Sequence, residues 1–233
     1  MKILIVNNLY KPFARGGAEK LAEMMVQELT AMGHEVMILT SLPRGERTQA
    51  TAEQIAYLPG ASRLFFGLNK LPAPLRLLFH LYGLIDPVAY FYTKRLIKKE
   101  KIELVVTHNL IGLGLVAFLA VKRSKIRHVH ILHDIQLLHP SGLMLWQNEG
   151  LIKSISARAY QHLTACYSGA AMKVVSPSSW LLQLHKQAGL FKNAAAEVQP
   201  NPFAEKMMCD TGTARKVAQC LFVGQLEKHK GID

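Results

Sequence analysis

The first forty residues read as one β-α-β unit, and this unit constrains the fold more than any other part of the chain. Lys2–Asn7 is an apolar run that ends in polar residues, which is typical of a buried parallel strand. Apolar residues at helical spacing follow from Leu21 to Met32, Gly33 supplies a helix stop, and His34–Thr40 forms a second strand. Parallel strands joined by a helix need helices packed on the sheet, so an α/β fold is predicted.

The same alternation of strand and helix continues as far as residue 199. Further strands are predicted at 54–58, 103–107, 127–133, 172–176 and 197–199, and helices at 111–123, 150–168 and 179–188, with a variable helical region from about 62 to 99. Half of the 233 residues are hydrophobic, which is enough for a sizeable core. We therefore expect a doubly wound, Rossmann-like, mostly parallel sheet over residues 1–202.

The last residues of the chain read as the start of a second domain. Residues 203–216 are polar and without periodicity, as in a linker, and residues 217–233 open a new unit. In it, the strand Leu221–Gly224 ends in a glycine turn and leads into a basic loop with Lys230, an arrangement that favours phosphate binding. Because a lone strand cannot bury both of its faces, either this tail docks onto the first domain or, as we expect, the second domain is incomplete in the chain.

The net charge of +12 calls for an anionic partner, which could be nucleic acid, anionic lipid or a phosphate-bearing substrate. Basic residues gather at 94–101 and 122–127, where they could also be solvated helix ends. The apolar region 71–92 runs directly into the first of these groups. This order is typical of a membrane-surface segment. Helices that pack under another part of the domain would show the same sequence pattern. Nucleic acid is not expected, because neither an aromatic-lined sheet nor a helix-turn-helix is recognisable.

The sequence also predicts the compartment. The three cysteines have no metal-binding spacing and fit a reducing cytosol. No signal peptide is recognisable after Met1-Lys2. The longest apolar stretch, from 110 to 121, has about 12 residues, where a spanning helix needs about 20. We expect a cytoplasmic protein, either soluble or bound to the inner face of the cytoplasmic membrane.

Polar residues follow the carboxyl ends of four predicted strands, which is where open α/β sheets bind their ligands. They are Asn7 and Asn8, His108 and Asn109, His133 and Asp134, and Ser176 to Ser178. A lone histidine is usually structural, but two histidines and an acid at the ends of successive strands favour a functional site. A metal site is not expected at His128, His130 and His133, because side chains alternate along a strand and no third ligand is placed nearby.

Several enzyme signatures are absent from the sequence. It contains no Gly-x-Ser-x-Gly elbow, no Walker phosphate loop, no Gly-x-Gly-x-x-Gly after the first strand and no Asp-x-Asp pair. A hydrolase triad, a P-loop ATPase, a dinucleotide dehydrogenase and a divalent-metal clamp are therefore poor interpretations. Gly16-Gly17 at the predicted helix start could contact a phosphate, or could simply form a tight turn.

Taken in order, six segments resemble glycosyltransferase family 4, the retaining, nucleotide-sugar-dependent enzymes of GT-B fold. They are Pro12 with Gly16-Gly17-Ala18-Glu19, Gly33-His34-Glu35-Val36, Leu132-His133-Asp134 with Pro140-Ser141-Gly142, Val175 to Ser179, Pro200-Asn201-Pro202-Phe203, and Phe222-Val223-Gly224 through Lys230-Gly231. The resemblance implies two Rossmann-like domains with the active site between them. The first domain would bind the acceptor and the second the nucleotide sugar.

The resemblance also implies roles for individual residues. Gly16 and Gly17 would approach the donor phosphates, His133 with Asp134 would lie against the transferred sugar, and Lys230 would neutralise the leaving pyrophosphate. The remaining polar strand ends, Asn8, His108, Asn109 and Ser176, would line the acceptor cleft. No metal or other cofactor is expected, since such enzymes need none.

One departure from the family concerns the leaving-group cations. The family usually has arginine where this chain has Gln225, and Lys228, the candidate substitute, lacks the bidentate geometry of arginine. The resulting prediction is a glycosyltransferase that acts on a cell-surface glycan or a lipid-linked acceptor. The alternatives are a non-catalytic membrane-surface or glycan-binding module and one half of a split enzyme.

Overall fold

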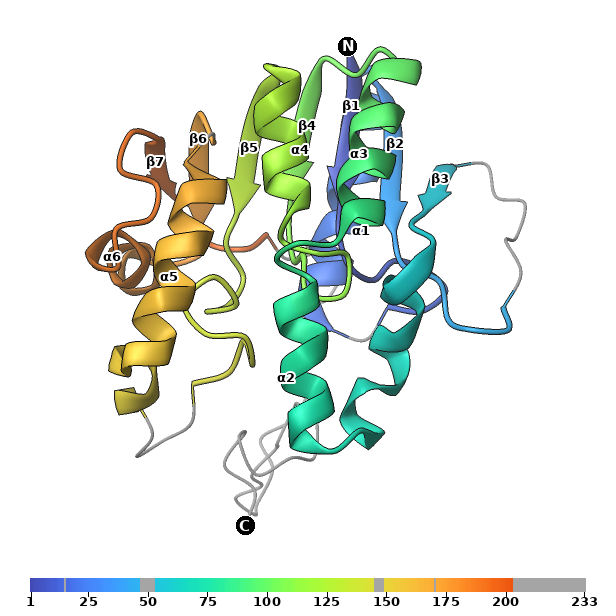
Figure 1. The fold of residues 1–233 in the computed structure, drawn as a ribbon. Coiled ribbons are helices and arrows are strands. Elements are labelled where there is room, and N and C mark those ends of the chain that lie inside the picture. Colours follow the sequence, from blue (N-terminus) through green and yellow to red (C-terminus); the bar gives the residue numbers. More distant parts are fainter. Residues whose placement is uncertain (15, 47–52, 145–148, 170, 203–233) are drawn as a thin grey trace, which may run out of the picture.

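The computed structural model describes residues 1–14, 16–46, 53–144, 149–169 and 171–202. Within these residues, seven parallel strands form one sheet in the order β3-β2-β1-β4-β5-β6-β7 (Figure 1). Their bounds are β1 Lys2–Val6, β2 Glu35–Thr40, β3 Gln54–Tyr57, β4 Leu104–Thr107, β5 Arg127–Ile131, β6 Lys173–Ser176 and β7 Ala195–Val198. The predicted doubly wound α/β sheet is confirmed. The predicted linker 203–216, the second domain 217–233 and Lys230 lie outside the described residues.

Helices cover both faces of this sheet, as the two-sided burial of β1 shows. Successive side chains of a strand point to opposite faces. Ile3 and Ile5 pack with apolar residues of α1, while Leu4 and Val6 belong to a core shared with α3, α4, α5 and α6. The helix bounds are α1 Gly17–Ala31, η1 Gly60–Lys70, α2 Ala73–Tyr82, α3 Pro87–Lys99, α4 Ala117–Ser124, η2 Glu149–Lys153, α5 Ile155–Ser168 and α6 Ser179–Gln187.

The helix predicted from residue 111 begins only at Ala117, and two glycines explain the difference. Gly112 and Gly114 have φ values of 97° and 90°, outside the right-handed helical region. Gly112 also lies against Phe65, since a Cβ at this position would be 2.6 Å from the ring. The segment before α4 is therefore a tight turn that brings the end of β4 against η1.

Two other predicted boundaries also move. The helix predicted at 150–168 is divided at Ser154, whose Oγ accepts a hydrogen bond from the N–H of Ala157 (3.2 Å) and starts α5. The strand predicted at 127–133 ends at Ile131, which leaves His133 in the loop beyond the sheet. This loop position frees the His133 side chain from the alternation of the strand.

The helical region predicted from 62 to 99 consists of η1, α2 and α3. Asp86 separates the last two, because its Oδ1 accepts hydrogen bonds from the N–H groups of Val88 (2.9 Å) and Ala89 (3.1 Å) and so starts α3. Helix α2 contains no buried residue and projects beyond the carboxyl edge of the sheet (Figure 1). It is thus placed to wall a site at that edge rather than to fill the core.

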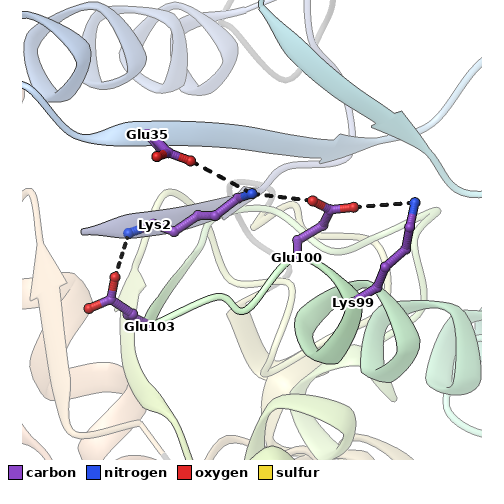
Figure 2. A network of polar contacts seen from close by, with 5 residues as sticks. All are labelled: Lys2, Glu35, Lys99, Glu100 and Glu103. Atoms are coloured by element: carbon purple, nitrogen blue, oxygen red, sulfur yellow. Dashed lines mark hydrogen bonds and ion pairs between the residues drawn. The ribbon is translucent and has the colours of Figure 1, made fainter.

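A polar network ties the opposite, amino edge together (Figure 2). Lys2 Nζ contacts Glu100 (3.2 Å) and Glu35 (3.7 Å), and the Lys2 N–H donates to Glu103 (2.9 Å). The hydrogen bond from Lys2, with that from Lys99, lowers the pKa of Glu100 below its usual value. The network links β1 to β2 and to the turn after α3.

Four residues of the two basic groups also lie at the amino edge. Lys98 and Lys99 occupy the last turn of α3, and Lys122 and Arg123 occupy the last turn of α4, where cations favour the helix dipole. Helices of a parallel sheet end where the next strand begins, so these four residues lie at the amino edge, whereas Lys94 and Arg95 lie about one turn earlier on α3. Region 71–92 itself extends into α3, where the exposed Phe91 lies four residues before Arg95, so the apolar surface bordered by the 94–101 cations stays a prediction.

Candidate active site

The carboxyl edge brings together the polar residues predicted after β1, β4 and β5, because these strands are neighbours in the sheet. The N–H of Asn8 donates to the carbonyl of Asn109 (2.8 Å), and Asn7 Oδ1 accepts from the N–H of Asn109 (3.2 Å). These bonds join the loops after β1 and β4. Asn8 is 6% exposed, and its Oδ1 is buried without a hydrogen-bond partner among the described residues.

His108 and His133 form a hydrogen-bonded pair at the ends of β4 and β5. Their Nδ1 and Nε2 atoms are 2.9 Å apart, and the rings are nearly parallel at 18° with centroids separated by 5.1 Å. Burial lowers the pKa of His133 to about 4. Burial, and to a smaller degree the charge of His133, lowers the pKa of His108 well below its usual value. Both rings are thus neutral at pH 7, which lets one donate and the other accept.

Asp134 is the carboxylate of this edge. Its pKa is raised to about 6, mainly by burial and to a smaller degree by the charge of Glu19, while the hydrogen bond from the Gln136 N–H (2.8 Å) acts in the opposite direction. A carboxyl group that titrates near neutral pH can accept a proton or a hydrogen bond from a substrate hydroxyl.

Gln136 is a residue of the site that sequence reasoning missed. Its Oε1 accepts from the N–H groups of Leu110 (2.8 Å) and Ile111 (3.1 Å), and its Nε2 donates to Asn109 Oδ1 (2.7 Å). The side chain is 2% exposed and holds the loop after β4 to the loop after β5. The only hint in the sequence is that Gln136 lies two residues after Asp134. This position does not predict which groups the Gln136 side chain bonds to.

Gly16 and Gly17 stand at the N-terminus of α1, as predicted. Gly16 has an extended backbone (φ −152°, ψ −167°), and neither glycine has a positive φ. Glu19 Oε2 accepts from the N–H of Gly16 (2.6 Å), whereas a Cβ on Gly17 would meet nothing within 4 Å. The alternative interpretation of a turn that needs glycine is therefore not supported, because other residues adopt these conformations. The bare Cα of Gly17 instead leaves room for a ligand.

Ser176 lies away from this group. It is fully buried, its Oγ donates to the carbonyl of Ser178 (2.8 Å), and it does not line the cavity described below. Ser178 in turn caps α6 through the N–H of Leu181 (3.2 Å). His108, which is fully buried, and His133 do not line that cavity either, so the cleft role of Ser176 and His108 stays a prediction.

A cavity of about 660 Å³ opens beside Asp134. Asn8, Asn109 and Asp134 line it from the strand ends, and residues of η1, α2, α5 and the 139–143 loop complete its wall. This size suits a small-molecule ligand, for which sites of about 300–1,000 Å³ are usual. Among the described residues, no three His, Cys, Asp or Glu side chains are placed to hold a metal ion.

The sequence profile of Glycosyltransferase Family 4 matches residues 15–204, which include every element from α1 to β7. The chain belongs to glycosyltransferase family 4. The family resemblance predicted from six short segments is thus confirmed.

Two similar proteins extend this finding. A Klebsiella pneumoniae protein described as an uncharacterized 42.6 kDa protein in the cps region is 30% identical over 240 residues, which cover all of this chain and 63% of that protein. Sucrose-phosphate synthase from Thermosynechococcus elongatus superposes with a TM-score of 0.57 at 12% identity, over 86% of this chain and 48% of its own. At that identity the likeness shows the fold alone. This family 4 chain therefore spans roughly half to two thirds of these two proteins.

Proposed function

We propose that this chain is the acceptor-binding part of a retaining family 4 hexosyltransferase, which moves a sugar from a nucleotide sugar to a cell-surface glycan or a lipid-linked acceptor. The cavity beside Asp134 carries the proposal, because it opens at the carboxyl edge where doubly wound sheets bind ligands. The similarity to a protein of a cps region supports a polysaccharide-building role. The proposed place of action is the cytoplasm or the inner face of the cytoplasmic membrane.

In this proposal the donor phosphates lie at the N-terminus of α1. Glu19 already accepts the hydrogen bond of the Gly16 N–H, so the phosphates are assigned to the open side of Gly17. The helix dipole favours an anion there. Lys230, outside the described residues, is proposed to approach the same pyrophosphate from the second domain. Positive charge from these two sources would stabilise the leaving group without a metal ion.

His133 and Asp134 are proposed to lie against the transferred sugar. The bond to His108 holds the neutral ring of His133 at the edge of the sheet, where it can exchange hydrogen bonds with sugar hydroxyls. Asp134 lines the cavity and can accept a hydrogen bond from the attacking hydroxyl of the acceptor. Asn8 and Asn109 are proposed to orient that acceptor.

Substitution of Gly17 tests the phosphate assignment. In the complete gene product, Gly17→Ala is expected to weaken nucleotide-sugar binding at least about tenfold, because the added methyl group would stand where the phosphate approaches. The fold should be unaffected, since the Cβ position is open. Isothermal titration with nucleotide sugar and a thermal melt would measure the two effects. Gly150→Ala, at another open position, is the matched control, and equal affinities for both variants would contradict the assignment.

The apolar face of α2 supports a membrane-surface location. Leu75, Leu77, Leu78, Leu81 and Tyr82 of α2 are 39–60% exposed, and Ile85 beyond it is 70% exposed. A solvated apolar helix of this kind is typical of proteins that dock on lipid. No helix within the described ranges is long and apolar enough to cross a membrane. We therefore propose that α2 contacts the lipid surface on which the acceptor resides.

Leu78→Gln is expected to reduce co-sedimentation with phospholipid vesicles about tenfold, because burying one leucine contributes about 1.5–3 kcal/mol. Leu163→Gln on α5, an equally apolar and 44% exposed position, serves as control. Loss of binding in both variants alike, or in neither, would contradict the role of α2. Vesicle binding by a complete gene product that binds no nucleotide sugar would instead favour the non-catalytic module.

A further inference from the structure

Three basic side chains meet at the cavity beside Asp134. Arg76 and His80 lie four residues apart on α2 and so share one face of that helix. His139 comes from the loop after β5, and all three line the cavity. Burial lowers the pKa of His80, and the positive charges of His139 and Arg76 lower it further, which shows that the three groups lie within electrostatic reach of one another. We call Arg76, His80 and His139 the basic cluster.

The local hydrogen bonds of His139 bear on which ring nitrogen carries its proton. Its Nδ1 accepts from the N–H of Ser141 (3.3 Å) and lies 2.8 Å from Ser141 Oγ. With Nδ1 as the acceptor, the neutral ring carries its proton on Nε2. His139 therefore presents an N–H group even when it is uncharged.

The charge of Arg76 is not balanced by an ion pair among the described residues. Asp134 is the one acidic residue among those lining the cavity, and its carboxylate bonds to the N–H of Gln136. Burial lowers the pKa of His80 and of His139, and an anion bound beside Arg76 would favour the protonated form of both rings. Arginine and histidine together also supply the forked and single donors that phosphate oxygens accept.

The rest of the cavity indicates what the anion is attached to. Phe65, Leu68, Leu77 and Leu81 from η1 and α2 make one side of the wall apolar. This apolar side continues onto the exposed outer face of α2. At the strand ends the wall is polar, and there the unpartnered Oδ1 of Asn8 is a hydrogen-bond acceptor without a donor among the described residues. The cavity thus has an apolar part, a cationic part and a hydroxyl-binding part.

We propose that the basic cluster binds the phosphate of an acceptor in which that phosphate joins a sugar to a hydrocarbon chain. The sugar then lies against Asn8 and Asn109, and the chain follows α2 toward the lipid surface. The acceptor role of this ligand rests on the proposed transferase function, but the binding site does not.

Binding of geranyl phosphate to the 233-residue chain tests the proposal, with geraniol and inorganic phosphate as the other two ligands, in isothermal titrations. Geranyl phosphate should bind at least about tenfold more tightly than either, since hydrogen bonds to a charged group and apolar contacts both contribute. Equal affinity for geraniol would overturn the phosphate site. Equal affinity for inorganic phosphate would overturn the assignment of a hydrocarbon chain.

Variants separate a local site from general charge attraction. Arg76→Gln and His139→Asn should each remove most of the preference for geranyl phosphate over geraniol, whereas Arg95→Gln should leave it unchanged. Arg76 and Arg95 are both exposed helix residues and lose the same charge, but only Arg76 lines the cavity. Equal losses in Arg76→Gln and Arg95→Gln would overturn the proposal. Circular dichroism melts of each variant confirm that the fold is retained.

Failure of this site can be told apart from failure of the transferase proposal, because the titrations use no nucleotide sugar. The protein could transfer sugar to an uncharged acceptor while geranyl phosphate binds no better than geraniol. This result would overturn the phosphate site and would agree with the transferase proposal. Selective binding of geranyl phosphate by a protein that transfers no sugar would support the site and overturn the transferase.

Discussion

His133→Ala is expected to lower sugar transfer by the complete gene product at least about 100-fold, the usual effect of removing one preorganised polar group from a reacting centre. His133 lies beyond the end of β5 in a loop, so it contributes little to the core. Its loss leaves Nδ1 of the buried His108 unpaired, which would cost about 1–3 kcal/mol of stability. Initial rates with a labelled nucleotide sugar, together with a thermal melt, separate these two effects.

His162→Ala is the matched control for this experiment. His162 is exposed on α5 and does not line the cavity, so its loss should change neither rate nor stability. A His133→Ala rate within twofold of the unsubstituted protein would remove His133 from the reacting centre. A rate that falls only as far as the folded fraction falls would give His133 a structural role instead.

The second large effect is acid sensitivity, which follows from five histidines whose pKa burial lowers strongly. They are His108, His128, His130, His133 and His185. His128 and His130 both contact Thr107 Oγ1, at 2.9 and 2.8 Å, and His130 stacks on Phe191 with ring centroids 5.4 Å apart. Burial lowers the pKa of His128, His133 and His185 to about 4, and it lowers the pKa of His108 and His130 well below 6.5.

The sign of the effect follows from where protons bind. Below about pH 6.5 the unfolded chain protonates these histidines while the folded chain does not, so the free energy of unfolding falls as the pH falls toward about 4. Each histidine contributes about 1.4 kcal/mol per pH unit in this range. Asp134, whose pKa is raised to about 6, acts in the opposite direction but is a single group. Since domains are stable by about 5–15 kcal/mol, we expect unfolding near pH 5.

Urea unfolding between about pH 7.5 and pH 5.5 measures this slope, and His130→Phe tests its origin. Phenylalanine can keep the stack on Phe191. The unfolded chain then takes up about one proton fewer, so the free energy of unfolding should change with pH by about 1.4 kcal/mol per pH unit less. His162→Gln, at an exposed position, should leave the slope unchanged. A free energy of unfolding that is constant over this range would show that the buried histidines do not control stability.

The sequence predicted the fold well because the decisive information is local. Strand and helix periodicities, and the stop at Gly33, are properties of neighbouring residues, and they led to the parallel sheet. The late start of α4 was missed because the contact between Gly112 and Phe65 joins residues far apart in the chain.

The site was predictable to the extent that topology alone determines it. Parallel strands end at one edge, so Asn8, Asn109, His108, His133 and Asp134 had to gather there. The bonds of Gln136 and the meeting of the basic cluster depend on loop conformations and on the position of α2, which no spacing in the sequence encodes. Ser176 followed the strand-end pattern but turned inward to its own loop.

Transfer of labelled sugar from nucleotide sugars to a lipid extract, catalysed by the purified complete gene product, tests the central proposal most directly. The account predicts label in the lipid fraction with at least one nucleotide sugar, release of the matching nucleoside diphosphate, and no change when divalent metals are chelated. No transfer from any common nucleotide sugar, by a protein shown to be folded, would contradict it.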